Sequence, residues 1–124
     1  MNEFIPQELE PVQLDKLGRE LANEVARLGK IVAGYEVEVT SKTKAYKIEM
    51  AKAKILLKDS KYSATIINAL SESEPDVVSA SNYLQQAEAN LIIGKAEYEA
   101  RDKQYTMVKK LIDLKVQEMR TFRG

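Results

Sequence analysis

Four lysines at helical spacing are the residues of this sequence best suited to binding chemistry. They are Lys44, Lys47, Lys54 and Lys58, within the stretch KTKAYKIEMAKAKILLK. On a helix of 3.6 residues per turn the four fall on one arc, and lysines at that density can contact phosphates. A coiled coil also places charged side chains on the arcs that flank its apolar seam. We favour this second interpretation over a nucleic-acid surface, because the 19 basic and 19 acidic residues of the chain cancel.

The alternative, a nucleic-acid surface, also draws on basic residues near the C-terminus. These are Lys109, Lys110, Arg120 and Arg123. Tyr46, which lies among the lysines, is able to stack on a base. The tyrosines nevertheless fit the core or rim of a helix pair better than a base-stacking surface.

The sequence lacks the residues on which most catalytic and metal sites depend. It contains no His and no Cys, which excludes catalytic triads, thiolate nucleophiles and zinc sites with nitrogen or sulfur ligands. It contains neither a GxGxxG nor a GxxxxGK[ST] loop, and no acidic loop with the spacing of Ca²⁺ ligands. We therefore expect no catalytic residue, no cofactor, no metal and no enzymatic activity.

Apolar residues at intervals of three and four predict two long helices. In the first half of the chain these residues are Leu14, Leu17, Leu21, Val25, Leu28, Val32, Val39, Tyr46, Met50, Ala53 and Leu57. In the second half the same spacing runs from Val77 to Phe122. Such persistence is typical of a coiled coil.

These patterns predict a single helical domain over residues 1–124. Its predicted parts are a flexible or extended tail at 1–12, a helix at 13–58, a short connector helix at 61–71 and a helix at 74–122. Gly29 and Gly34 predict either a kink or a close approach of another backbone, with a break near 29–34. Ser73, just ahead of Pro75 and Asp76, is predicted to cap the second long helix. The connector could instead be a packed turn, but its apolar spacing favours a helix.

The distribution of charge predicts that the two long helices are antiparallel. Residues 41–61 carry seven lysines and two acids, whereas residues 62–100 carry one lysine and six acids. Residues 1–40 have four more acids than bases, and residues 101–124 have four more bases than acids. An antiparallel hairpin places each block beside one of opposite sign. Exposed pairs contribute only about 0–1 kcal/mol each, so the blocks select orientation more than they add stability.

A second apolar stripe on each helix predicts that the hairpin associates with other copies. Both stripes lie nearly opposite the main seam, and a helix with two apolar sides needs two neighbours. The predicted interface residues are Ile48, Ile55, Ile93, Ala96, Ala100, Met107, Leu111 and Leu114. We therefore expect an all-α antiparallel coiled-coil hairpin that assembles into a homodimer or higher oligomer, unless the N-terminal portion folds back as a third helix.

Part of the sequence resembles small α-helical coiled-coil accessory proteins encoded in bacteriophage genomes. The resemblance covers about residues 42–122 and rests on AYKIEMAKAKILLK, a short Ser/Thr-led connector and AEANLIIGKAEYEARDKQYTMVKKLIDLKVQEM. It implies an accessory role in phage DNA metabolism, such as recombination or replication, or interference with a host protein. It implies no catalytic residue.

The expected function is therefore that of a non-enzymatic interaction protein that binds itself and a protein partner. The alternative is a nucleic-acid-binding accessory protein that uses the lysine arc. Uninterrupted apolar runs such as Ile55 to Leu57 are only a few residues long, too short to cross a bilayer. Because the sequence also has no apolar leader, we expect a cytoplasmic protein, in the host cytoplasm if it is viral, with no membrane contact.

Overall fold

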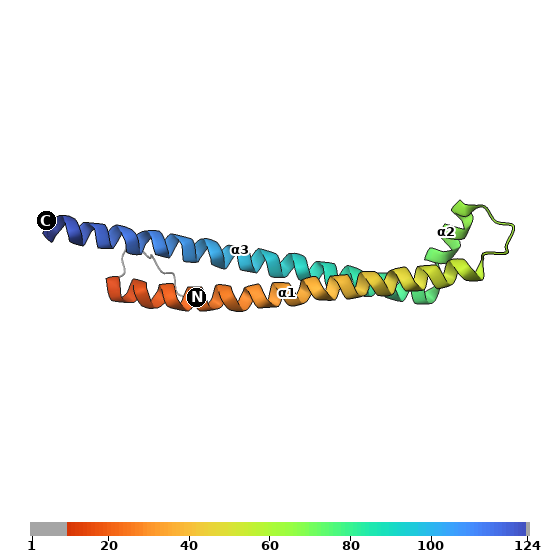
Figure 1. Cartoon of the computed structure of the whole chain (residues 1–124), viewed down its shortest axis with the longest axis horizontal. Helices are drawn as coiled ribbons and strands as arrows, with labels where there is room; N and C mark the ends of the chain where they lie inside the picture. Colours follow the sequence, from red (N-terminus) through yellow and green to blue (C-terminus); the bar gives the residue numbers. More distant parts are fainter. Residues whose placement is uncertain (1–9, 124) are drawn as a thin grey trace. The chain divides into compact units, whose positions relative to one another are not determined.

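The computed structural model describes residues 10–123, and their side chains as far as residue 121. Within this range the chain forms three α-helices: α1 (Pro11–Leu56), α2 (Ala64–Glu72) and α3 (Pro75–Arg123). Figure 1 shows α1 and α3 running in opposite directions, with α2 following the end of α1. The predicted fold class, an all-α antiparallel hairpin with a short connecting helix, is confirmed. Each helix begins and ends within three residues of its predicted position.

Two local predictions about the first helix differ from the structure. Pro11 and Val12, predicted to belong to a tail, form the first residues of α1, and the remaining tail residues, 1–9, lie outside the described range. Proline suits this position because the first turn of a helix leaves its backbone N–H groups without helical partners. The predicted break at 29–34 is not present, because α1 continues through both glycines. Seam residues on either side, Leu28 and Val32, are buried or half-buried, so packing offsets the cost of about 1 kcal/mol for each glycine.

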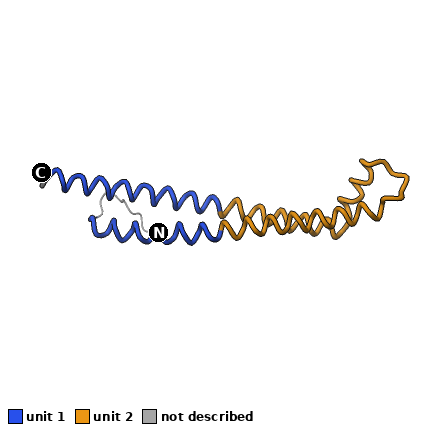
Figure 2. Tube along the Cα trace, in the orientation of Figure 1, with its two compact units in different colours: residues 1–31, 95–124 blue, residues 32–94 orange. Residues whose placement is uncertain are grey.

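The chain divides into two compact units (Figure 2). Unit 1 comprises the described parts of residues 1–31 and 95–124, and unit 2 comprises residues 32–94. Each unit pairs one segment of α1 with one segment of α3, and unit 2 also contains α2.

The core of unit 1 is built from large side chains. Leu14 and Val108 are fully buried, and Leu21 completes the central cluster. Half-buried side chains pack around it: Leu17, Tyr105, Leu111 and Ile112. Burying a leucine or valine contributes about 1.5–3 kcal/mol, so these contacts between α1 and α3 dominate the stability of the unit.

The core of unit 2 is built from small side chains. Its buried residues in the long helices are Ala53, Val77, Ala80, Ala87 and Gly94. At Gly94 the ring of Tyr35 comes so close that an added Cβ would lie 2.8 Å from the ring carbon Cδ2. The absence of a side chain on α3 therefore makes room for an aromatic ring on α1.

Serines terminate the connecting helix at both ends. The hydroxyl of Ser63 accepts the backbone N–H of Ile66 at 3.3 Å and caps the N-terminus of α2. Ser73 donates its hydroxyl to the carbonyl of Leu70 at 2.7 Å and ends α2. The prediction that Ser73 caps the second long helix is therefore wrong. That helix begins instead at Pro75, after Glu74, whose carbonyl accepts the N–H of Val78 at 2.9 Å.

Two glycine substitutions should change stability in opposite directions. Gly34→Ala adds a methyl group to open space and should raise the free energy of unfolding by about 1 kcal/mol through helix propensity. Gly94→Ala gains the same propensity but forces its Cβ against the half-buried Tyr35 ring, so it should lower the free energy of unfolding by about 1 kcal/mol. Chemical denaturation of both variants measures the difference. Equal stabilisation by the two substitutions would contradict the close approach at Gly94.

Candidate interaction surfaces

The four lysines of the predicted arc lie in unit 2 with exposed side chains, three of them on α1. They are Lys44, Lys47, Lys54 and Lys58, the last in the turn after α1. None of them forms an ion pair with another residue in the described range. Their charges are therefore available to a binding partner.

The basic residues predicted near the C-terminus belong to the other unit. Lys109, Lys110 and Arg120 are exposed on α3 in unit 1. The ammonium group of Lys109 lies 5.2 Å from the centre of the Tyr105 ring, a cation–π contact within the helix. The side chain of Arg123 lies outside the described residues. The two predicted groups of basic residues thus fall on different units.

In unit 2 the predicted interface residues keep their apolar side chains exposed. The exposed fractions are 54% for Ile48, 68% for Ile55 and 62% for Ile93. Packing of α1 against α3 therefore leaves more than half of each of these side chains in solvent. We call these three residues the outer stripe of unit 2.

In unit 1 most of the predicted interface residues are also exposed. These are Ala96, Ala100, Met107 and Leu114. Leu111 differs, because it packs half-buried against the Leu14, Leu21 and Val108 cluster. Its inclusion among the outer residues is a wrong prediction, since its apolar surface already has a partner within the chain.

Sequence reasoning missed part of the exposed apolar surface of unit 2. Val37 on α1 and Ile92 on α3 are strongly exposed, and Val37 lines a shallow groove of about 730 Å³ together with Lys44 and Ile48. Val37 precedes Ile48 by eleven residues, which is three helical turns. The polar residues between them, Ser41 and Lys44, interrupted the apolar pattern and concealed it.

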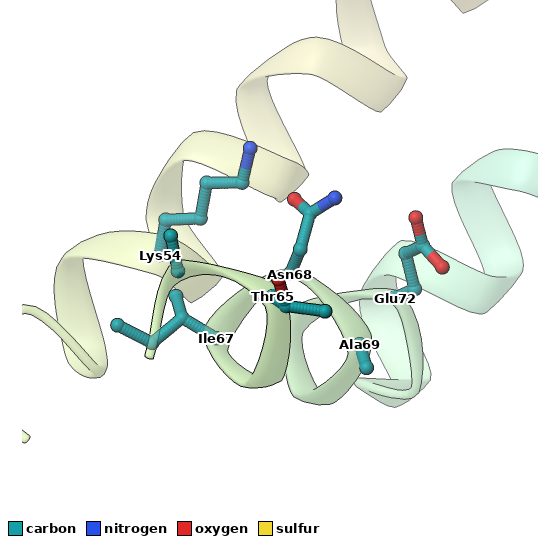
Figure 3. A pocket seen from close by; sticks show the side chains of 7 residues that line it. Lys54, Thr65, Ile67, Asn68, Ala69 and Glu72 are labelled. Atoms are coloured by element: carbon teal, nitrogen blue, oxygen red, sulfur yellow. The ribbon is translucent and has the colours of Figure 1, made fainter. Parts of the chain in front are cut away.

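A second groove lies between the end of α1 and one side of α2, in unit 2. It measures about 670 Å³, and its lining consists of Lys54, Ala64, Thr65, Ile67, Asn68, Ala69 and Glu72 (Figure 3). The sequence patterns gave no signal for this groove, because it forms only where the turn at residues 57–63 brings α2 back towards α1. Its floor of small and apolar side chains, together with four polar side chains, suits recognition of another surface.

The ion pairs among residues 10–121 each lie within one helix. They are Arg19–Asp15, Arg27–Glu24, Lys42–Glu38 and Lys52–Glu49. Between the helices of unit 2, the ammonium group of Lys42 lies 5.4 Å from the centre of the Tyr83 ring. No ion pair therefore joins α1 to α3 among these residues.

In unit 1 the electrostatics centre on Glu24 and Arg27. The Arg27 guanidinium donates two hydrogen bonds to the Glu24 carboxylate. These bonds lower the pKa of Glu24, with a smaller contribution from the charge of Arg101 on α3. The same carboxylate raises the pKa of Arg27, and Glu97 on α3 adds to the effect. Charges on α3 thus favour the ionised forms of Glu24 and Arg27 on α1.

The described residues show neither a metal site nor a membrane span. No group of three or more acidic side chains among them is placed to hold a metal ion. None of their helices combines the length and apolar character that crossing a bilayer requires. Comparison of the chain with protein-family models, curated proteins and solved structures finds no match.

Removal of Arg27 should raise the pKa of Glu24 towards its ordinary value. Arg27→Gln deletes the hydrogen bonds that are the largest cause of the lowered pKa, and a carboxyl-detected NMR titration measures the change. Because the folded pKa of Glu24 lies below the unfolded one, the stability that it contributes is present above the unfolded pKa and lost as the pH falls through the folded pKa. The wild-type chain should therefore lose more stability on acidification than Arg27→Gln.

Arg19→Gln provides the control for this titration, because Arg19 pairs with Asp15 and not with Glu24. It removes the same charge from the same helix and should leave the pKa of Glu24 where it is. An unchanged Glu24 pKa in Arg27→Gln, or an equal rise in both variants, would contradict the assignment.

Proposed function

We propose that this chain is a non-enzymatic interaction protein, a helical hairpin that associates with further copies of itself and binds a protein partner. One observation carries the proposal: Ile48, Ile55 and Ile93 stay more than half exposed after α1 and α3 have packed together. Apolar side chains at helical spacing that are left outside a two-helix contact are stabilised by a further helix. A second copy supplies one, and the resemblance to phage-encoded helical proteins supports an accessory or host-interference role for the assembly.

The outer stripe of unit 2 is the surface through which we propose that copies associate. Each of its three side chains is β-branched and therefore stiff, which lowers the entropy lost on packing. In unit 1, considered by itself, the exposed residues Ala96 and Ala100 are small and would permit close approach of a helix from another copy. Burial of apolar surface at about 25 cal/mol per Å² supplies the driving force.

Substitution of Ile93 by Glu should weaken the self-association of the chain. Placing a charge in an apolar contact costs several kcal/mol unless the charge is paired, so the dissociation constant should rise by at least about a hundredfold. Sedimentation equilibrium at micromolar concentrations measures it. Thr106→Glu is the matched control, because it adds one acid at an exposed position of the same helix about 140° around the helix from Ile93, and it should associate like the wild type. A wild-type chain that stays monomeric over this range contradicts the proposal.

The second candidate function is nucleic-acid binding, and the exposure of all four arc lysines favours it. An ammonium group that has no ion-pair partner in the described residues breaks no ion pair there when it contacts a phosphate, and each such contact releases a counterion. The zero formal net charge of the chain weighs against this function, since most nucleic-acid binders carry a basic excess.

A fourfold substitution separates the two candidate functions. Replacing Lys44, Lys47, Lys54 and Lys58 by Gln should leave self-association through the outer stripe intact. It should abolish retention on single- and double-stranded DNA at low salt if the arc binds phosphate, and wild-type retention should then fall steeply as salt is raised. Equal retention of the wild-type and substituted chains, or no retention of either, would eliminate the nucleic-acid function.

A further inference from the structure

We propose that the groove beside α2 is a second site of self-association, in which two copies pair tip to tip about a two-fold axis. This inference deepens the proposed function, because it gives the self-associating chain a contact distinct from the outer stripe. The groove lies between Lys54 on α1 and the side of α2 that carries Asn68 and Glu72. We call Lys54, Asn68 and Glu72 the tip row.

The tip row presents a positive, an amide and a negative side chain to solvent. Figure 3 shows the polar ends of all three pointing in the same direction from the groove-lining helices, with Asn68 between the other two in this view. Asn68 and Glu72 are four residues apart on α2, a spacing that places two side chains on one helix face. None of the three side chains has a hydrogen-bond or ion-pair partner among the described residues.

A row of this composition is complementary to its own reversed copy. A two-fold axis through Asn68 brings Lys54 opposite Glu72 of the second copy and Glu72 opposite its Lys54. The two Asn68 side chains then meet at the axis, where each amide donates through its N–H and accepts through its carbonyl oxygen. An isologous interface has this property, that the same patch serves on both subunits.

The floor of the groove permits the close approach that such pairing needs. Ala64 and Ala69 contribute only a methyl group each, and Ile67 adds a half-buried apolar surface. Packing of these small residues against the same residues of a second α2 excludes water from the apolar floor while the charges lie at its edges. A second copy is therefore the occupant that matches both the charges and the shape.

Charge reversal of the tip row tests the pairing. In Lys54→Glu, two acids face each other at each end of the row, and in Glu72→Lys two lysines do so, so either variant alone should weaken tip pairing by at least about tenfold at low salt. An equimolar mixture of the two variants restores opposite charges at both ends and should form heterodimers with affinity near that of the wild type. Native mass spectrometry of differently tagged variants measures the heterodimer fraction.

The mixture separates pairing between chains from an effect within one chain. If Lys54 and Glu72 acted only on each other within one copy, the double variant K54E/E72K would associate like the wild type, whereas the mixture of the two single variants would remain weakened. Lys61→Glu, an exposed lysine outside the groove, controls for the change in net charge and should pair like the wild type. Single variants that associate as tightly as the wild type, with no preference for heterodimers in the mixture, would overturn the tip contact.

A disulfide probe gives an independent readout, because the chain contains no cysteine of its own. Asn68→Cys should form a covalent dimer under mild oxidation, since residues at a two-fold axis approach within the distance of about 4.4–6.8 Å between Cα atoms that a disulfide requires. Glu88→Cys, exposed on α3 in the same unit and about 140° around the helix from Ile93, should form no covalent dimer. Equal cross-linking of the two variants would contradict the axis.

The outcomes also separate this inference from the outer-stripe proposal. If only Ile93→Glu weakens association, the outer stripe stands and the tip contact fails. If only the tip-row variants weaken it, or Asn68→Cys cross-links although Ile93→Glu has no effect, the tip contact stands and the outer stripe fails. With both contacts in place, the wild-type chain should form assemblies larger than a dimer, and the loss of either contact should leave a dimer.

Discussion

The rest of the structure depends on size matching between the facing seams of α1 and α3. In unit 1 the seams contribute leucine and valine side chains that fill the contact, with Leu14 and Val108 fully buried. In unit 2 the same antiparallel contact is made by alanines and by Gly94 under the ring of Tyr35. A close-packed interior tolerates neither voids nor excess volume, so the Tyr35 ring on α1 requires a residue without a side chain, Gly94, opposite it on α3. This matching fixes which face of each helix is buried and therefore which face is left outside.

Which face of each helix is left exposed follows directly from which face is buried between α1 and α3. A contact between two helices covers one arc of each helix, and apolar residues on the opposite arc remain in solvent. Such residues stabilise a monomer very little, because burial in a hairpin requires that they face the other helix. Their presence at seam-like spacing in Ile48, Ile55 and Ile93 is therefore easier to explain by contact with a further helix than by the stability of one chain.

The sequence predicted the fold well because helix packing leaves a periodic signal. The seam residues recur at intervals of three and four residues, and every seam residue of α1 is buried or half-buried in the structure. Predictions failed where one residue had two physically reasonable roles. The Ser73 hydroxyl can accept a backbone N–H from the helix that follows it or donate to a carbonyl of the helix that precedes it. In the structure it donates to the carbonyl of Leu70. Leu111 lies near the edge between the two arcs, and only the packing of Leu14 and Val108 shows that it belongs to the core.

Other features depend on tertiary contacts that no local pattern encodes. Steps of seven from Leu14 pass through Leu21, Leu28 and Tyr35 to Lys42 and Glu49, so this heptad position becomes polar within unit 2 although the seam itself continues with apolar residues. These two polar residues are half-buried, and they line a small groove together with Ala80 and Tyr83 of α3. The groove beside α2 is another such case, since Lys54 and Glu72 are far apart in sequence and meet only because the chain turns between them.

Charges with local partners and charges without them have different roles in this chain. Pairs such as Arg19–Asp15 and Lys52–Glu49 lie one turn apart on exposed helix faces, where each contributes about 0.2–0.5 kcal/mol to the helix and carries no information about a partner. Lys54 and Glu72 have no ion pair among the described residues and lie at the edges of an apolar floor. In the proposed tip contact, desolvation there would make an opposite charge favourable and a like charge costly, so these positions would discriminate between partners and orientations more than they add affinity. Under this proposal the unpaired charges set the selectivity of association, whereas the apolar faces that the hairpin leaves uncovered supply its driving force.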